Sequence, residues 1–159
     1  MQVLDASSAL HAWDNYPLDQ FPPLWAWLAR RIAVGELAIP VVALEEVDHK
    51  YPECAAWLKA QRIRVLPMTE AMLMDALRIK NLLDIQGESY GSGVGENDLF
   101  IVAAARAHEA ELLTDEGRQP NLPQSRRNYK IPAVCALPEV QTVCLSFVEF
   151  LKRSQAVFG

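Results

Sequence analysis

The sequence predicts an α/β fold in which helices cover a parallel sheet of five strands. Short apolar runs alternate with longer amphipathic stretches along the 159 residues, and this alternation is typical of β-α-β units. Each gap between successive apolar runs is long enough for the helical crossover that two parallel strands require. Apolar residues make up 51% of the chain, which is enough for one continuous core. We therefore expect a single domain over residues 1–159.

The expected elements follow one another in a regular order from the amino terminus. The strands, which are short and mostly apolar, are 2–4, 37–39, 64–66, 111–114 and 142–145. The helices that separate and follow them are 8–13, 22–34, 41–50, 53–61, 69–84, 98–108 and 147–155. Two of these helices carry a stripe of residues at helical spacing, and we expect both stripes to face the core. The stripes are Trp25, Trp27, Leu28 and Ile32, and Met72, Leu73, Ala76, Leu77 and Lys80.

The composition excludes several classes of protein. The longest apolar stretch, 24–34, is interrupted by two arginines, and no apolar leader precedes the first strand, so we expect a cytoplasmic protein without a membrane span. The three cysteines are odd in number and never in C-x-x-C spacing, which favours reduced core thiols over disulfides or a zinc site. These cysteines are Cys54, Cys135 and Cys144. The three histidines share no ligand spacing either.

The charge distribution is uneven. The net charge of −5 argues against a protein that coats nucleic acid by bulk electrostatics. Residues 117–130, however, contain four basic side chains and no acid. A basic loop of this kind either contacts a phosphate backbone or is an ordinary solvated surface loop, and the sequence favours neither. The four residues are Arg118, Arg126, Arg127 and Lys130.

Acidic residues stand where the carboxyl ends of the strands are expected. Asp5 directly follows the first strand, and Asp115 and Glu116 follow the fourth. Glu46 lies in the helix after the second strand, and its side chain leans back toward the strand ends. Asp98 opens the helix that leads into the fourth strand. Ligands of open parallel sheets bind outside the carboxyl ends of the strands, so the chemistry is expected there.

Each acid also has a purely structural explanation. Asp98, preceded by a possible cap at Asn97, could simply favour a helix amino terminus, and Glu46 beside Glu45 could belong to a solvated helix face. Asp5 is harder to explain in this way, because an acid at the end of a buried strand needs donors or a cation. Converging carboxylates repel one another and raise one another's pKa unless a cation binds. Oxygen ligands alone select Mg²⁺ or Mn²⁺, which support phosphodiester hydrolysis.

Four segments in order resemble the motifs of PIN domains, small metal-dependent ribonucleases that include the VapC-type toxins of toxin–antitoxin pairs. The segments are VLDASSALHAW, IPVVALEEV, NDLFIVAAA and ELLTDE. The tail is similar to a PIN branch in which a basic segment and a K-I-P-x-V-C stretch follow the final acidic strand. The resemblance covers almost the whole chain. It implies a three-layer α/β/α sandwich with strand order 3-2-1-4-5.

Carried over by position, the resemblance implies which residues bind metal. They are Asp5, Glu46, Asp98 and Glu116. The last position is commonly aspartate in the family, so whether Asp115 or Glu116 faces the metal stays open. Ser7 and Thr114 match the hydroxyl residues that support the metal carboxylates, and the basic loop would contact RNA.

The activity implied is that of a Mg²⁺- or Mn²⁺-dependent endoribonuclease, acting as a toxin with an antitoxin partner and forming a homodimer. The alternative is a PIN-like module that no longer cuts and instead binds RNA or protein. A nuclease of branched DNA is a further alternative. A haloacid-dehalogenase phosphatase is disfavoured, because it needs a second aspartate where this chain has Ser7, and no G-K-[ST] phosphate loop exists.

Overall fold

All five strands of the protein form one parallel sheet. The structure is a computed structural model that describes residues 1–159. The strands are β1 (Gln2–Leu4), β2 (Leu37–Pro40), β3 (Arg64–Leu66), β4 (Glu111–Leu113) and β5 (Cys144–Leu145). Their order is β3-β2-β1-β4-β5, and every neighbouring pair is parallel. This order confirms the predicted α/β fold and its strand order 3-2-1-4-5.

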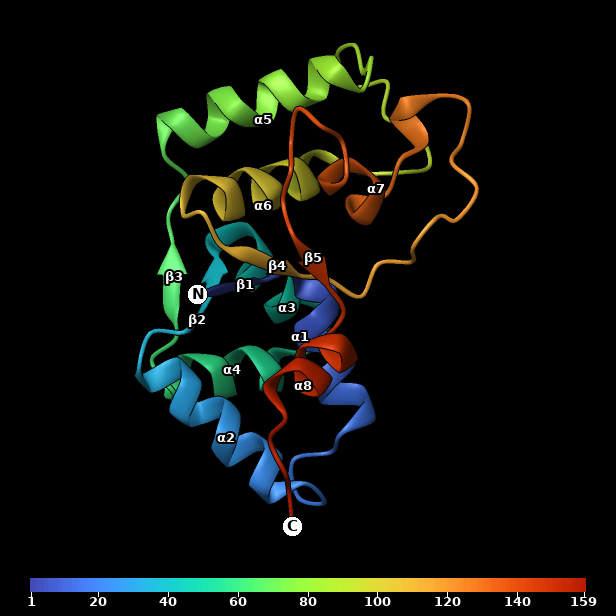
Figure 1. Cartoon of the computed structure of the whole chain (residues 1–159). Coiled ribbons are helices and arrows are strands. Elements are labelled where there is room, and N and C mark those ends of the chain that lie inside the picture. Colours follow the sequence, from blue (N-terminus) through green and yellow to red (C-terminus); the bar gives the residue numbers. More distant parts are fainter.

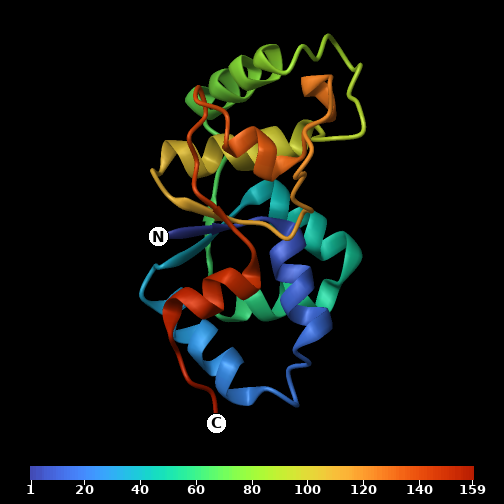
Figure 2. The same cartoon turned by 45° about the vertical axis from the view of Figure 1, so that its right-hand side comes forward.

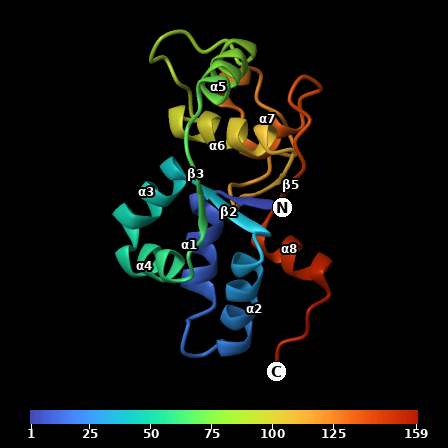
Figure 3. The same ribbon diagram turned by 90° about the vertical axis from the view of Figure 1, so that its left-hand side faces the viewer.

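Helices cover both faces of the sheet (Figures 1 and 3). One layer contains α5 (Glu70–Leu82), α6 (Glu96–Ala107) and α7 (Ile131–Cys135). The opposite layer contains α1 (Ala6–Asn15), α2 (Pro22–Ala33), α4 (Pro52–Ala60) and α8 (Phe147–Ser154). Between the layers, α3 (Val41–Lys50) follows β2 directly and contacts both α4 and α6. The carboxyl ends of β1, β2 and β4 therefore open between α1, α3 and the start of α6.

The core runs through the sheet and both helical layers as one cluster of 43 buried residues. Parallel strands are covered on both faces, which explains why β1, β2 and β4 are almost entirely apolar. The thiols of Cys54, Cys135 and Cys144 are all free, and the first two are buried, as expected for core cysteines. None of the helices is both long enough and apolar enough to cross a membrane.

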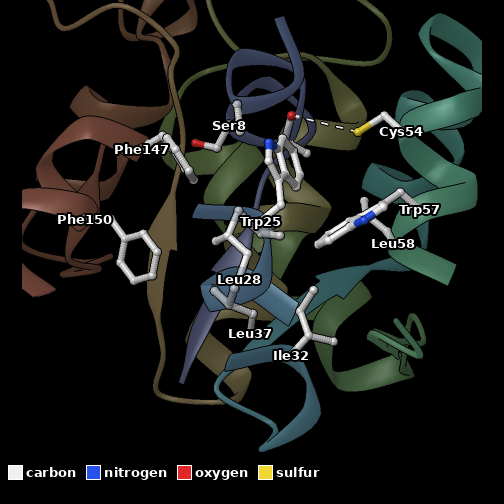
Figure 4. Close-up of a pocket in the computed structure, with 13 residues that line it drawn as sticks. Ser8, Trp25, Leu28, Ile32, Leu37, Cys54, Trp57, Leu58, Phe147 and Phe150 are labelled. Carbon is white, nitrogen blue, oxygen red and sulfur yellow. Dashed lines mark hydrogen bonds between the residues drawn. The ribbon is translucent and has the colours of Figure 1, made fainter. Parts of the chain in front are cut away.

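A small cavity lies between α1, α2, α4 and α8 (Figure 4). Of its 13 lining residues 12 are hydrophobic, and its volume of about 20 Å³ is room for roughly one water molecule. The thiol of Cys54 donates a weak hydrogen bond to Ala9 O (3.9 Å) in its wall. The cavity is a packing feature of the core and is too small and too apolar for a substrate.

Several element boundaries differ from those predicted. The helix expected from residue 98 begins at Glu96, and β5 begins at Cys144 because Thr142 N–H donates to Cys135 O (3.0 Å) instead of joining the ladder. The short helices η1 (Arg126–Asn128) and α7 were not predicted. Leu73 and Leu77, expected in the core, are 43% and 49% exposed, because α5 turns only its Met72, Ala76 and Ile79 face toward the core.

Candidate metal centre

Asp5 is buried at the carboxyl end of β1. Its backbone N–H donates to Leu113 O (2.8 Å), which anchors the residue to the end of β4. The residue is only 2% exposed, and its carboxylate has hydroxyl partners but no cationic partner. Burial raises the pKa of Asp5, although hydrogen bonds from Ser7 and Thr114 oppose the rise. The sheet thus holds a carboxylate that has lost most of its water without gaining a positive charge.

Two hydroxyl groups fix the orientation of this carboxylate. Ser7 Oγ and Thr114 Oγ1 (2.8 Å) both donate to the same oxygen, Asp5 Oδ2. Each hydroxyl also accepts a backbone N–H from the segment after β4: Ser7 from Asp115 (2.9 Å) and Thr114 from Glu116 (3.3 Å). Neither hydroxyl bonds Oδ1. Ser7 and Thr114 therefore couple Asp5 to the segment after β4 and leave Oδ1 without a hydroxyl partner, while the backbone N–H groups of Ala6 and Ser7 also help to lower the pKa of the carboxyl.

Asp98 is the third residue of α6 and lies in the first turn. The expectation that Asp98 opens the helix behind an Asn97 cap was wrong: Gly95 is the N-cap, and Asp98 Oδ2 accepts the Gly95 N–H (2.8 Å). Burial raises the pKa of Asp98 to about 7, this hydrogen bond lowers it, and the charges of Glu116, Asp5 and Glu46 raise it further. A carboxyl that would normally be ionised is therefore partly protonated near neutral pH.

Glu46 and Glu116 complete an acidic cluster with Asp5 and Asp98. Burial raises the pKa of Glu46, followed by repulsion from Asp5, while Lys50 on the same helix lowers it. Burial likewise raises the pKa of Glu116, as do the charges of Asp5 and Glu46. Glu45 is exposed whereas Glu46 is half-buried, so helix α3 turns Glu46, not its neighbour, toward the other acids. Four elements thus deliver mutually repelling carboxylates to one edge of the sheet.

Asp115 faces away from the acidic cluster. Its carboxylate accepts hydrogen bonds from Ser8 Oγ (2.7 Å) and from the backbone N–H of Phe147 at the start of α8 (3.2 Å). His11 Nδ1 lies 3.9 Å from its other oxygen. Asp115 therefore joins α1 to the amino terminus of α8, where the helix dipole favours a negative charge.

The acidic cluster has the chemistry of a hard-cation site but is not closed around a metal position. None of its four acids takes part in an ion pair. In the structure no three acidic, histidine or cysteine side chains are close enough together to coordinate one metal ion. Unpaired carboxylates, one buried and three half-buried, that raise one another's pKa nevertheless fit a divalent cation with oxygen ligands, because such a cation would remove the repulsion. The residues fit Mg²⁺ or Mn²⁺ in charge and donor type.

Glu116 has a partner that the sequence did not indicate. Its Oε2 accepts the backbone N–H of Ile131 at the start of α7 (3.1 Å), and this bond lowers the pKa of the glutamate. A short helix is hard to predict from periodicity, but Pro132 in its first turn is a signal for a helix start. The bond ties the segment after β4 to the far end of the basic loop.

The basic loop (residues 117–130) packs against the glycine-containing loop (residues 87–95) that precedes α6 (Figure 2). Val94 N–H donates to Tyr129 O (2.9 Å), and Ser92 N–H donates to Asn128 Oδ1 (3.0 Å). Only glycine fits at position 93, because a Cβ there would lie 2.1 Å from Tyr129 O. These two loops border the edge of the sheet at which Asp98 and Glu116 lie.

The four basic residues of residues 117–130 have different surroundings. Arg118 pairs with Glu149 (2.8 Å), and Arg126 donates to Leu82 O (3.4 Å). Arg127 and Lys130 are exposed, and their side chains make no hydrogen bond or ion pair. Two of the four predicted phosphate contacts are therefore already engaged within the protein.

The sequence matches one described family along nearly its whole length. A family model described as a domain of unknown function (DUF4411) matches residues 2–158. The chain belongs to this family. No curated protein matches the sequence.

Solved structures share the fold of this DUF4411 protein at low sequence identity. VapBC2 from Rickettsia felis, bound to a DNA fragment from its promoter, is 18% identical, with a TM-score of 0.58 over 91% of this chain and 97% of that one. FitAcB from Neisseria gonorrhoeae is 14% identical, with a TM-score of 0.54 over 91% and 96%. A toxin–antitoxin complex from Klebsiella pneumoniae is 16% identical, with a TM-score of 0.50 over 77% and 93%. At these identities the likeness establishes the fold alone.

Proposed function

We propose that this protein is a metal-dependent ribonuclease of the PIN type that hydrolyses RNA phosphodiester bonds. The observation that carries the proposal is the acidic cluster, in which four elements bring one buried and three half-buried carboxylates together, none of them in an ion pair. The carboxyl groups of such a cluster raise one another's pKa and destabilise the fold unless a cation binds. A purely structural role therefore does not explain why the four acids lie together. The shared fold and the motif resemblance support the same activity.

In this proposal Asp5, Glu46, Asp98 and Glu116 hold Mg²⁺ or Mn²⁺. When bound, the metal would polarise a phosphoryl oxygen and lower the pKa of water. Ser7 and Thr114 keep Asp5 in one orientation and leave Oδ1 free of hydroxyl partners. Asp98 would hold the cation as a carboxylate, so cation binding would compete with the proton that Asp98 partly retains at neutral pH, where its pKa is about 7. Asp115 supports the site through α8 rather than as a ligand.

We also propose that the protein acts as the toxin of a toxin–antitoxin pair, with an antitoxin protein as its partner, and that it forms a homodimer. The fold supports this role, since one of the solved structures that share it is described as a toxin–antitoxin complex. The exposed arginine and lysine of residues 117–130 would meet the RNA backbone beside the acids.

The test is cleavage of single-stranded RNA by wild type and Asp5→Asn in Mn²⁺. We expect wild type to cleave and Asp5→Asn to be inactive without a lower melting temperature, because asparagine is neutral and can still accept hydrogen bonds from the two hydroxyls. Asp48→Asn is the matched control, since Asp48 is exposed on α3 and makes no ion pair. Absence of cleavage by wild type would favour a binding-only module, and preference for branched DNA would favour a DNA-structure nuclease. Full activity of Asp5→Asn would remove the assignment.

A further inference from the structure

The backbone of Lys130 is held in place at the end of the basic loop. Its N–H donates to Gln119 Oε1 (2.8 Å), and Gln119 Nε2 donates in turn to Asn128 O (3.0 Å). The next N–H along the chain, that of Ile131, donates to Glu116 Oε2 (3.1 Å). The side chains of Gln119 and Glu116 therefore hold the backbone at Lys130 and at the residue after it.

The glycine-containing loop supports the same segment from the other side. The bond from Val94 N–H to Tyr129 O and the close approach of Gly93 to Tyr129 place two backbones in direct contact. Such an approach is open only to a residue without a Cβ. The residue before Lys130 is thus held against the loop that leads into Asp98 and α6.

The Lys130 ammonium group lies beside the acidic cluster without being bound to it. Its Nζ is 4.0 Å from the position that a Cβ on Gly117 would occupy, directly after Glu116 in the chain. Its charge lowers the pKa of Glu116. The lysine nevertheless forms no ion pair, and Nζ donates no hydrogen bond. Arg118 and Arg126 are engaged with Glu149 and Leu82, as described above. Lys130 is therefore the cation of the basic loop that is both near the acids and free to bind a ligand.

We infer that Lys130 is a catalytic residue whose ammonium group contacts the phosphate oxygens of a substrate held at the acidic cluster. The inference rests on the proposed nuclease function and names a role within that site. A phosphodiester is anionic and approaches four carboxylates, so a positive group at their rim offsets the repulsion. An ammonium offers three donors to phosphate oxygens, and its charge acts most strongly where negative charge builds up during displacement. Lys130 should therefore affect turnover as well as binding.

The test compares Lys130→Ala and Lys130→Arg with wild type on a single-stranded RNA oligonucleotide at saturating Mn²⁺. We expect Lys130→Ala to lower kcat by roughly 10- to 100-fold, somewhat less than the loss of a fully buried donor, and Lys130→Arg to restore most of it. Lys59→Ala is the matched control. It removes the same charge from an exposed lysine in the last turn of α4, just before the amino end of β3, and should leave kcat unchanged.

A second readout measures binding of the same oligonucleotide in Ca²⁺ by fluorescence anisotropy. Losing one phosphate contact should make the dependence of log K on log salt shallower by about 0.7 for Lys130→Ala and leave it unchanged for Lys59→Ala. If Lys130 only balances the charge of Glu116, its removal will shift the Mn²⁺ concentration needed for activity while kcat at saturation and the salt slope stay at the wild-type values. That result would overturn the inference and leave the proposed function standing. A wild-type protein that never cleaves RNA would overturn both.

Discussion

Replacing Asp98 by asparagine should stabilise the metal-free protein at alkaline pH. Asp98 is half-buried beside three other acids, and its pKa is about 7 instead of the usual 3.8. Between these values the folded protein keeps a proton that the unfolded chain has lost, so unfolding releases a proton and stability falls as pH rises. The stabilising contribution of the protonated form is complete below about pH 4 and lost above about pH 7. Wild type in a chelator should therefore melt at a higher temperature near pH 5 than near pH 8.

The size of the effect follows from that difference in pKa. At about 1.4 kcal/mol per pKa unit, a rise from 3.8 to about 7 corresponds to about 4 kcal/mol at pH 8. Asparagine keeps the acceptor for Gly95 N–H but loses a favourable charge in the first turn of α6, worth about 0.3–1 kcal/mol. A net gain of roughly 3 kcal/mol remains, or on the order of 5–10 °C in Tm for a chain of this length.

The assay is a thermal melt of wild type, Asp98→Asn and Glu96→Gln with a chelator near pH 5 and near pH 8. Glu96→Gln is the matched control, because it removes an exposed carboxylate from the same turn of α6. We expect Asp98→Asn to melt slightly above wild type near pH 5, where about a third of the effect is already present, and well above it near pH 8, while Glu96→Gln follows wild type at both. An Asp98→Asn protein that melts at or below wild type near pH 8 would refute the idea of an uncompensated acidic cluster.

Two further predictions concern the same edge of the sheet. Asp115→Asn should lower stability by about 1 kcal/mol, through the weakened contact with the start of α8, yet keep its stabilisation by Mn²⁺. In thermal melts Glu116→Gln should keep its stability without metal but lose its stabilisation by Mn²⁺. If only Asp115→Asn loses that stabilisation, Asp115 is the metal ligand and Glu116 is not. The affinity for Mn²⁺, measured by calorimetry, should weaken as pH falls from 8 to about 6, since protons compete for Asp98. An affinity that does not change over this range would contradict a role for Asp98 in binding the cation.

Much of the fold follows from local sequence because parallel strands leave a strong pattern. The bounds of β1, β3 and α3 were predicted as observed, since an apolar run or a proline marks their boundaries. The bounds of the shortest elements were not predicted. α7 and η1 are too brief to show a helical period, and β5 lost its first residues to a turn with α7 that only the tertiary structure specifies. The exposure of Leu73 and Leu77 likewise depends on how α5 rotates on α6, which spacing alone did not reveal.

The candidate site was predictable in its residue types and less so in its geometry. Strand ends identified Asp5, and chain order with the motif resemblance identified Glu46 and Asp98. Neighbouring acids could not be separated by sequence, because a loop has no fixed period. In the structure Asp115 binds the start of α8 while Glu116 stays beside the other acids. The metal-binding role of the cluster stays a prediction.

Whether the four acids bind a divalent cation can be seen by anomalous scattering from a crystal of the protein soaked in Mn²⁺. We expect one or more peaks among the four acids, with carboxylate oxygens of Asp5 and Asp98 about 2.0–2.4 Å from manganese. A fully soaked crystal with no peak between β1 and α6, or with manganese bound only at other surface acids, would contradict this expectation.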